Sequence, residues 1–321
     1  MIRIKLMVLL IVSNCFVHAK TYTFVPKWEK GDQKTVSIEY HEQEYKNDSL
    51  VEDSTYYNEA TIKVKSVSDT KYKLEIIMEN QAMKQIIELY DKLGDDLLAY
   101  QNMKLVYSIN RKTGDYKLLN WKEAKEFLFT SFAQMDSALA RKAPEAEGMG
   151  SLMLAPILAL LNTEENVSAY FAKNIDYLLV PFWKEFELGQ TITEIDSADN
   201  PFSKGEKLSQ TNYTTMDSLY NRKKSAIISH VVDVDFSSVI SMLKKMTKEM
   251  MSGFGLAEEK IDEKLKEFDN MQMDQVNKTI YYYDVKTTWI NKCVAEATVI
   301  ATDPRNKAVT KKVVQSITTI K

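Results

Sequence analysis

Apolar and polar residues alternate with a period of two through much of the chain that follows residue 20. The clearest alternation lies in three segments, 34–41, 60–65 and 71–76. In the first, Val36, Ile38 and Tyr40 alternate with polar residues, and lysines occupy the polar side of the other two. Successive side chains of a strand point to opposite faces, so this pattern predicts strands with one packed and one solvated face. The turn residues Ser68, Asp69 and Thr70 between the last two predict an antiparallel meander.

A β-hairpin is predicted over residues 105–118. Leu105, Tyr107 and Ile109 precede a turn at 112–115, and Gly114 supplies the residue that tolerates a positive φ there.

The period changes to that of a helix in the middle of the chain. Asn120, followed three residues later by Glu123, predicts a capped helix start, and apolar residues continue at helical spacing as far as Leu139. Proline and glycines in 141–150 are expected to end this helix. Thr163 with the acidic Glu164 and Glu165 predicts a second helix start, and that helix continues to Pro181.

The last third returns to strands and includes one helical hairpin. The hairpin is expected over 236–268, with its break at Gly253, Phe254 and Gly255. The predicted strands are 189–196, 206–217, 224–234, 277–286, 293–301 and 307–320.

The pattern as a whole predicts an α+β fold. A curved antiparallel β-sheet is expected, with helical segments near 120–180 and 235–270 covering its concave face. The chain has 321 residues, and no repeat or flexible linker divides it, so residues 20–321 are expected to form a single domain.

Residues 1–19 indicate export. Arg3 and Lys5 precede an apolar run, and Ala19 provides a small residue before the expected cleavage site, as in a secretory signal peptide. A minor alternative is lipidation at Cys15, although Asn14 is unsuitable before such a site. We expect a periplasmic or extracellular protein.

Charge and cysteine content exclude several classes. The chain has 42 Lys and Arg against 45 Asp and Glu, which gives no reason to expect nucleic acid as a partner. After cleavage Cys293 would be the sole cysteine, so no internal disulfide is expected, and its strand-like surroundings predict a buried structural thiol. The apolar run 152–161 is too short to span a bilayer, so no transmembrane segment is expected in the mature chain.

Signals for catalysis are few. His41-Glu42 lacks the second histidine of a zinc-protease motif, and no phosphate-binding or dinucleotide-binding loop is present, so neither metal nor cofactor is expected. His230, Asp233 and Asp235 are the candidates for a carboxylate-dependent hydrolase, but His230 lies on an apolar strand face that favours a core histidine.

Methionine and aromatic residues on the predicted helices suggest an apolar cavity between helices and sheet. Flexible thioethers suit surfaces that fit varied apolar shapes, although ordinary packing of an amphipathic helix onto the sheet is the favoured explanation of the methionines alone. The candidate cavity-wall residues are Phe127, Phe132, Leu154, Leu158, Met242, Met246 and Met250.

Two short stretches resemble a known group of proteins. Trp28-Glu29-Lys30-Gly31-Asp32 and Tyr283-Asp284-Val285-Lys286-Thr287-Thr288-Trp289-Ile290 resemble uncharacterised exported proteins common in Bacteroidota. The resemblance implies a long-stranded half-barrel similar in outline to the periplasmic lipoprotein carrier LolA. In those proteins a glycine commonly stands where this chain has Thr288, and the resemblance implies no catalytic residues.

The sequence therefore favours an exported, non-enzymatic protein that binds a lipid or another apolar ligand. One alternative is a structural or assembly subunit of the cell envelope, which would have an envelope protein as its partner. The other alternative is the carboxylate-dependent hydrolase.

Overall fold

The structure is a computed structural model. It describes residues 20–79, 102–142, 161–199, 207–220, 222, 224–234, 240–241, 244–245, 247–248, 251–252, 257–268, 272–302 and 308–321.

An antiparallel sheet of eleven strands dominates the fold, in the order β6-β5-β4-β3-β2-β13-β12-β11-β10-β9-β8. The sheet is not closed, because β6 and β8 form separate edges. This confirms the predicted antiparallel, β-rich architecture. The strands are β2 (Gln33–Lys46), β3 (Ser49–Val67), β4 (Lys71–Glu79), β5 (Asn102–Asn110), β6 (Tyr116–Leu118), β8 (Thr191–Asp199), β9 (Lys207–Tyr220), β10 (Ser225–Val234), β11 (Gln272–Asp284), β12 (Ile290–Thr302) and β13 (Val309–Ile320).

The hairpin between β2 and β3 is longer than the alternation predicted. Asn47 and Asp48 adopt φ values of 47° and 63° in the turn, the left-handed conformation that a tight hairpin requires. Residues 42–46 and 49–59 are mostly polar, so their alternation left no signal in the sequence.

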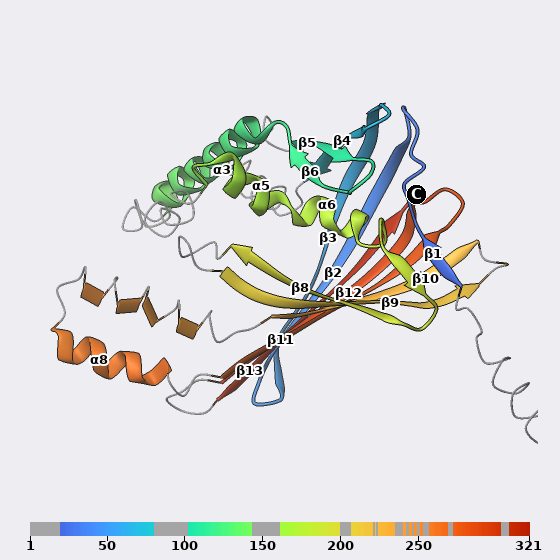
Figure 1. Cartoon of the computed structure of the whole chain (residues 1–321). Coiled ribbons are helices and arrows are strands. Elements are labelled where there is room, and N and C mark those ends of the chain that lie inside the picture. Colours follow the sequence, from blue (N-terminus) through green and yellow to red (C-terminus); the bar gives the residue numbers. More distant parts are fainter. Residues whose placement is uncertain are drawn as a thin grey trace, which may run out of the picture.

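Helices α5 (Glu164–Phe171) and α6 (Lys173–Leu179) lie inside the curve of the sheet. The sheet bends so that β4–β6 and β8–β10 form two arms on either side of these helices (Figure 1). One helix was expected up to Pro181, but the chain breaks at Ala172, which ends α5 and begins α6. Thr163 caps α5 as predicted, since its hydroxyl accepts a hydrogen bond from the Asn166 amide at 3.2 Å.

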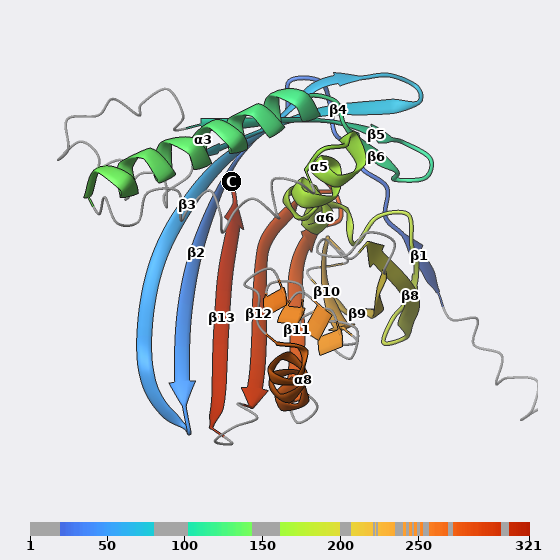
Figure 2. The same cartoon turned by 90° about the vertical axis from the view of Figure 1, so that its left-hand side faces the viewer.

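Two further helices lie at opposite ends of the sheet (Figure 2). Helix α3 (Trp121–Lys142) crosses beside β3 to β5, and α8 (Glu258–Glu267) lies near the ends of β11 and β12 (Figure 2). Residues 240–241, 244–245, 247–248 and 251–252 are also helical, in the predicted first arm of the hairpin. Within the described part of the chain, none of the helices combines the length and apolar character needed to cross a membrane.

A small second sheet pairs β1 (Thr21–Thr23) with β7 (Glu185–Glu187). Each of these strands is only three residues long, too short to show alternation, and the sequence did not predict them.

The N-terminal segment is fixed to the far end of the chain by two tryptophans. The rings of Trp28 and Trp289 stack with centroids 5.0 Å apart, and the Lys27 amide donates to Thr288 Oγ1 at 2.7 Å. The stretches 28–32 and 283–290 therefore touch each other and help to hold the N-terminal segment on the sheet.

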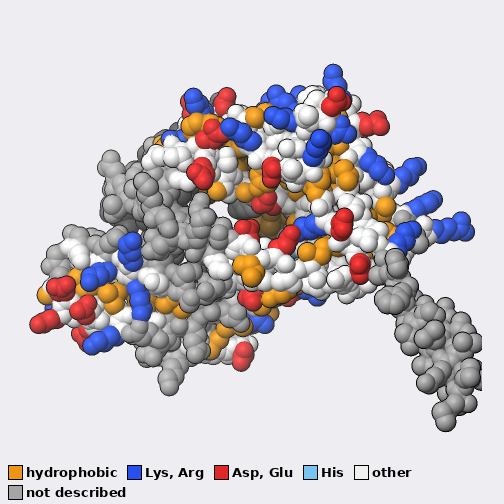
Figure 3. Space-filling model, viewed as in Figure 1, with side chains coloured by type: hydrophobic (Ala, Val, Ile, Leu, Met, Phe, Trp, Pro, Cys, Tyr) orange, Lys and Arg blue, Asp and Glu red, His pale blue; other side chains and the backbone are white. Residues whose placement is uncertain are grey.

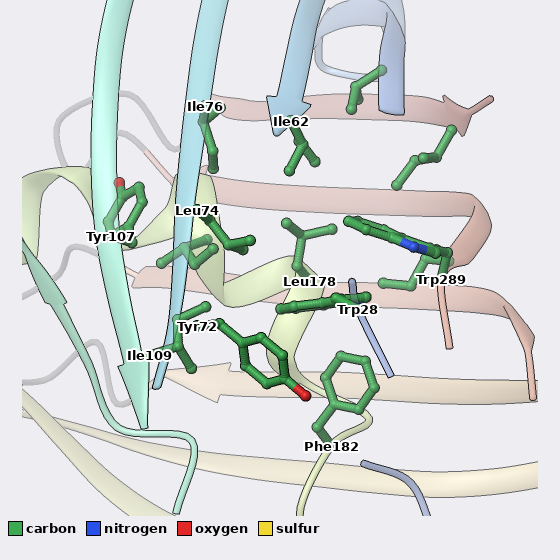
Figure 4. Close-up of a cluster of buried hydrophobic side chains, with 14 of the residues drawn as sticks. Trp28, Ile62, Tyr72, Leu74, Ile76, Tyr107, Ile109, Leu178, Phe182 and Trp289 are labelled. Atoms are coloured by element: carbon green, nitrogen blue, oxygen red, sulfur yellow. The ribbon is translucent and has the colours of Figure 1, made fainter. Parts of the chain in front are cut away.

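The core lies between the inner face of the sheet and α5 and α6. Figure 4 shows Leu178 of α6 against side chains of β3, β4 and β5, with Trp28 and Phe182 beside it. Ile62, Leu74 and Ile109 are fully buried there. The Tyr107 hydroxyl donates to the Phe171 carbonyl at 3.0 Å, which links β5 to the end of α5.

Candidate ligand-binding face

The face of the sheet that points toward α5 and α6, here called the inner face, has two zones. The first zone belongs to the core. Strand register places five buried residues side by side across β9 to β13: Met216, Ile228, Tyr281, Cys293 and Thr318. Burial raises the pKa of the Cys293 thiol to about 12, so this thiol is protonated and unreactive at neutral pH.

The second zone begins two residues further along each strand. Register joins one residue from each of seven neighbouring strands, β9 to β3, into a line that we call the hydroxyl row. Thr214 is buried, and the other six residues are half-buried. The hydroxyl row consists of Thr214, His230, Thr279, Ala295, Ser316, Tyr40 and Tyr56.

The next line across the same strands mixes amides and aliphatic side chains. Asn212, Val232, Asn277, Ala297 and Val314 are register partners in this line, which ends at the carboxylate of Glu42 and at Ser54, and all seven are half-buried. The inner face thus changes from a packed apolar core to a mixed surface of small polar and aliphatic groups.

His230 contributes an uncharged ring to the hydroxyl row. Its Nδ1 is hydrogen-bonded to Thr214 Oγ1 at 3.0 Å. Burial lowers the pKa of His230 to about 4, the nearby Lys184 ammonium adds to this lowering, and Glu194 opposes the shift. His230 is therefore neutral at physiological pH.

Tyr40 and Tyr56 form the aromatic end of the hydroxyl row. Their rings stack with centroids 4.8 Å apart and planes 11° apart. Burial raises the pKa of Tyr40, the Tyr56 hydroxyl adds to the shift, and a hydrogen bond with Asn58 opposes it. Glu42 belongs to the next line, and Lys312, one inner-face position further along β13, places its Nζ 2.5 Å from the Glu42 carboxylate, so these two charges neutralise each other.

The surface is hollowed between α6 and β8, with hydrophobic side chains in its depth and acidic side chains at its rim (Figure 3). On the α6 side, the Tyr116 hydroxyl donates to the Asp176 carboxylate at 2.6 Å. Burial raises the pKa of Asp176, the bond from Tyr116 opposes this, and Asp196 of β8 adds to it. On the β8 side, Lys184 forms an ion pair with Glu194.

The structure does not bring the candidate catalytic residues together. His230 lies on the inner face of β10, whereas Asp233, three residues along the strand, is exposed on the opposite face. Asp235 lies outside the described residues. Among the residues that the structure describes, no three His, Cys, Asp or Glu side chains are grouped to hold a metal ion.

The seven predicted wall residues are mostly beyond what the structure describes. Phe127 is half-buried on α3, close to the sheet end of that helix. Phe132 is in α3, but its side chain is not described, and Leu154, Leu158, Met242, Met246 and Met250 lie outside the described residues. The hydroxyl row was missed because its members are far apart in the sequence. The spacing of Thr279 and Tyr281, or of Ile38 and Tyr40, indicated only that each pair shares a face.

Comparisons with known proteins identify no relative. No family model and no curated protein matches the chain. Three solved structures align over most of the chain with very low scores. The outer membrane protein OprG of Pseudomonas aeruginosa aligns at 5% identity and a TM-score of 0.16, covering 92% of this chain and 96% of that one. Ail, the attachment invasion locus protein of Yersinia pestis, aligns at 5% identity and a TM-score of 0.15, covering 91% of this chain and 99% of that one. The outer membrane protein OpdK of P. aeruginosa aligns at 7% identity and a TM-score of 0.14, covering 84% of this chain and 62% of that one. Scores this low do not establish a shared fold.

Proposed function

We propose that this chain is an exported, non-enzymatic binding protein of the cell envelope, which holds the apolar part of a lipid-like ligand on the inner face of its open sheet. In this proposal the sheet is a half-barrel similar in outline to LolA, and the helices cover its concave side. The ligand lies in the second zone, beyond the residues that α5 and α6 already cover.

The observation that carries the proposal is the distribution of charge between the two faces of β10, β11 and β12. Within the described part of these strands, the inner face presents no Lys, Arg, Asp or Glu. Side chains on the outer face include the charged residues Asp233, Lys278, Asp284, Lys292 and Glu296. A half-buried strip without charges is the kind of surface from which an apolar chain displaces water at low cost.

Strand β12 gives this strip a suitable shape for a linear chain. Its inner-face residues beyond the core are Ala295, Ala297, Val299 and Ala301, and all four are half-buried. They pair with longer side chains on β11, among them Gln275 and Asn277. An extended acyl chain along β12 would contact small aliphatic groups over its length.

Native mass spectrometry of the gently purified full chain tests this proposal. We expect a co-purifying lipid, or binding of dodecanoate after delipidation. Ala297→Trp should reduce dodecanoate affinity about tenfold, because the indole would occupy the strip. Ile300→Trp on the outer face of the same strand is the matched control and should leave the affinity unchanged. A protein that repeatedly purifies empty and binds none of dodecanoate, dodecyl maltoside and dodecylphosphocholine would refute the proposal.

A second candidate function, as an assembly subunit of the envelope, is favoured by the β8 edge. At the other edge of the sheet, the Asn120 side chain satisfies part of the β5 backbone. It accepts a hydrogen bond from the Val106 amide and donates one to the Lys104 carbonyl, both at 2.8 Å. Strand β8 pairs only with β9 in the described part of the chain, and its Ile195 is 81% exposed. An exposed edge of this kind can pair with a strand of another protein. Cross-linking in cells from position 195 would then give one dominant protein neighbour and no lipid.

A further inference from the structure

The hydroxyl row places polar groups on six of its seven strands across the inner face, with Ala295 between Thr279 and Ser316. Hydroxyls come from Thr214, Thr279, Ser316, Tyr40 and Tyr56, and His230 adds an imidazole. Neighbouring strands lie about 4.8 Å apart, so polar groups on adjacent strands of the row are separated by about that interval. This interval is close to the length of one sugar unit in an extended glycan.

The row is also uncharged. It contains no carboxylate, ammonium or guanidinium, and His230 is neutral because of its burial. The charged groups nearest to its two ends are already paired, Lys184 with Glu194 and Lys312 with Glu42. A phosphate or sulfate group would require Arg or Lys side chains directed at it, and the row offers none.

A purely apolar ligand does not fit the row either. Thr214, Tyr40 and Thr279 already have protein partners in His230, Asn58 and Tyr281, but hydroxyls covered by an acyl chain could make no hydrogen bond to the ligand and would lose those that they make to water, which is unfavourable. The stacked pair of Tyr40 and Tyr56 offers an aromatic surface with hydroxyl groups attached, suited to a ligand that has both C–H faces and hydroxyls.

We propose that the hydroxyl row binds the uncharged, hydroxyl-bearing part of the ligand, a sugar group, while the apolar chain of the same ligand lies along β12. This inference rests on the proposed function and narrows the ligand to neutral glycolipids. Thr279 and Ser316 donate and accept at the centre of the row, on either side of Ala295, and the tyrosine pair contacts the sugar at one end.

Calorimetric titration of the full-length, delipidated protein tests the inference. Three of the probes share one dodecyl chain and differ in their head group. The probes are dodecyl maltoside, dodecylphosphocholine and dodecanoate, each below its critical micelle concentration, and free maltose. We expect the maltoside to bind at least about fivefold more tightly than the other two dodecyl probes, because hydrogen bonds to its sugar add to the shared contribution of the chain.

Substitutions within the hydroxyl row distinguish binding of the sugar head group from binding of the acyl chain. The double variant Thr279→Val with Ser316→Ala should weaken maltoside binding about tenfold and change dodecanoate binding less than about twofold. Thr298→Val on the outer face of β12 is the matched control and should change neither. Tyr40→Phe, which removes a hydroxyl and keeps the ring, provides an independent test if the double variant does not fold.

The outcomes distinguish the two proposals. Equal binding of the three dodecyl probes, unchanged in the double variant and in Tyr40→Phe, would overturn the sugar assignment and leave the proposed function standing. Failure of all three dodecyl probes to bind would overturn the proposed function. Maltose binding as tightly as the maltoside would support the row as a sugar site but refute the role of the acyl chain.

Discussion

At the scale of single residues, Thr288 has the least expected conformation. It is a buried β-branched residue with φ of 60°, a backbone region that glycine adopts more easily. This explains why a glycine would suit the position. Here the side chain compensates for the strain: Oγ1 accepts from the Lys27 amide at 2.7 Å and donates to the Thr287 carbonyl at 2.6 Å.

Two substitutions at Thr288 should therefore differ. Thr288→Val keeps the strain and loses the hydroxyl, which leaves the Lys27 amide without its partner, so the free energy of unfolding should fall by about 1–3 kcal/mol. Thr288→Gly also loses the hydroxyl but relieves about 1–2 kcal/mol of strain, so it should be more stable than the valine variant. Urea unfolding monitored by tryptophan fluorescence measures both. Equal stability of the two variants would show that the backbone is not strained.

His230 should make stability depend on pH. Its pKa is about 4 in the folded protein against an ordinary value of 6.5. Between these values the unfolded state binds more protons, so this contribution is fully present above about pH 6.5 and is lost as the pH falls toward 4. Because the ring is half-buried, we expect a loss of roughly 1–2 kcal/mol rather than the full value of the shift. Urea midpoints of the wild type and His230→Gln across this range measure the difference, and parallel curves would contradict it.

At the scale of secondary-structure elements, the β5–β6 hairpin depends on Gly114. This residue has φ of 82°, and a Cβ added to it would lie 2.5 Å from Cε3 of the Trp183 ring. The ring cannot easily move, because Trp183 Nε1 donates to the Arg111 carbonyl at 2.9 Å.

Gly114→Ala should therefore lower the free energy of unfolding by more than about 2 kcal/mol, from backbone strain and steric overlap together. Gly31→Ala is the control: Gly31 has φ of 96°, but no atom lies within 4 Å of an added Cβ, so only the strain of about 1 kcal/mol is expected. Thermal and urea unfolding of both variants would show the difference, and similar losses would mean that Trp183 relaxes away.

Most elements followed from the sequence because their signals are local. The alternation of β2, β3 and β4 and the Gly114 turn are confirmed, as is the capped start of α5. The role of Asn120 was wrong: α3 begins at Trp121 as expected, but the Asn120 side chain bonds to the β5 backbone instead of capping the helix. Asparagine suits both a helix N-cap and a side chain that bonds to an exposed strand backbone. Only the position of β5 in space shows which of the two roles Asn120 has.

At the scale of the whole molecule, the N-terminal segment connects the two sheets and the helices. Trp28 packs on Trp289, Tyr72 and Phe182, whose ring centroids lie 5.0, 5.3 and 5.5 Å away. It is 3% exposed. These contacts join residues from both ends of the chain to the segment that follows α6.

Trp28→Ala should lower the stability of the whole molecule by about 3–5 kcal/mol, since it removes a fully buried ring at this junction. Trp121→Ala removes a half-buried ring from the start of α3 and should cost clearly less. Differential scanning calorimetry of both variants measures the loss. A small effect at Trp28 would show that the N-terminal segment is not required for the fold.

The candidate site could not be predicted to the same extent as the fold. The hydroxyl row exists only because seven strands align in one register, and long segments of chain separate most of its members. Sequence patterns identify which residues of a strand share a face, but the residue that lies opposite on the next strand depends on turns and bulges, such as the shift between Ile227 and Ile228. The predicted site residues were therefore apolar residues of helices, and the polar strand positions were not predicted.

Cys293 gives the protein a built-in reporter of its own opening. The thiol is buried on the inner face and held protonated, directly beside Ala295 in the next inner-face position of β12. Because the thiol is buried, an alkylating reagent reaches it only when the structure around it opens, so the labelling rate measures how often that opening occurs. A molecule seated along β12 would slow the labelling, which offers a screen for the natural cargo in crude extracts even while that cargo is chemically unidentified.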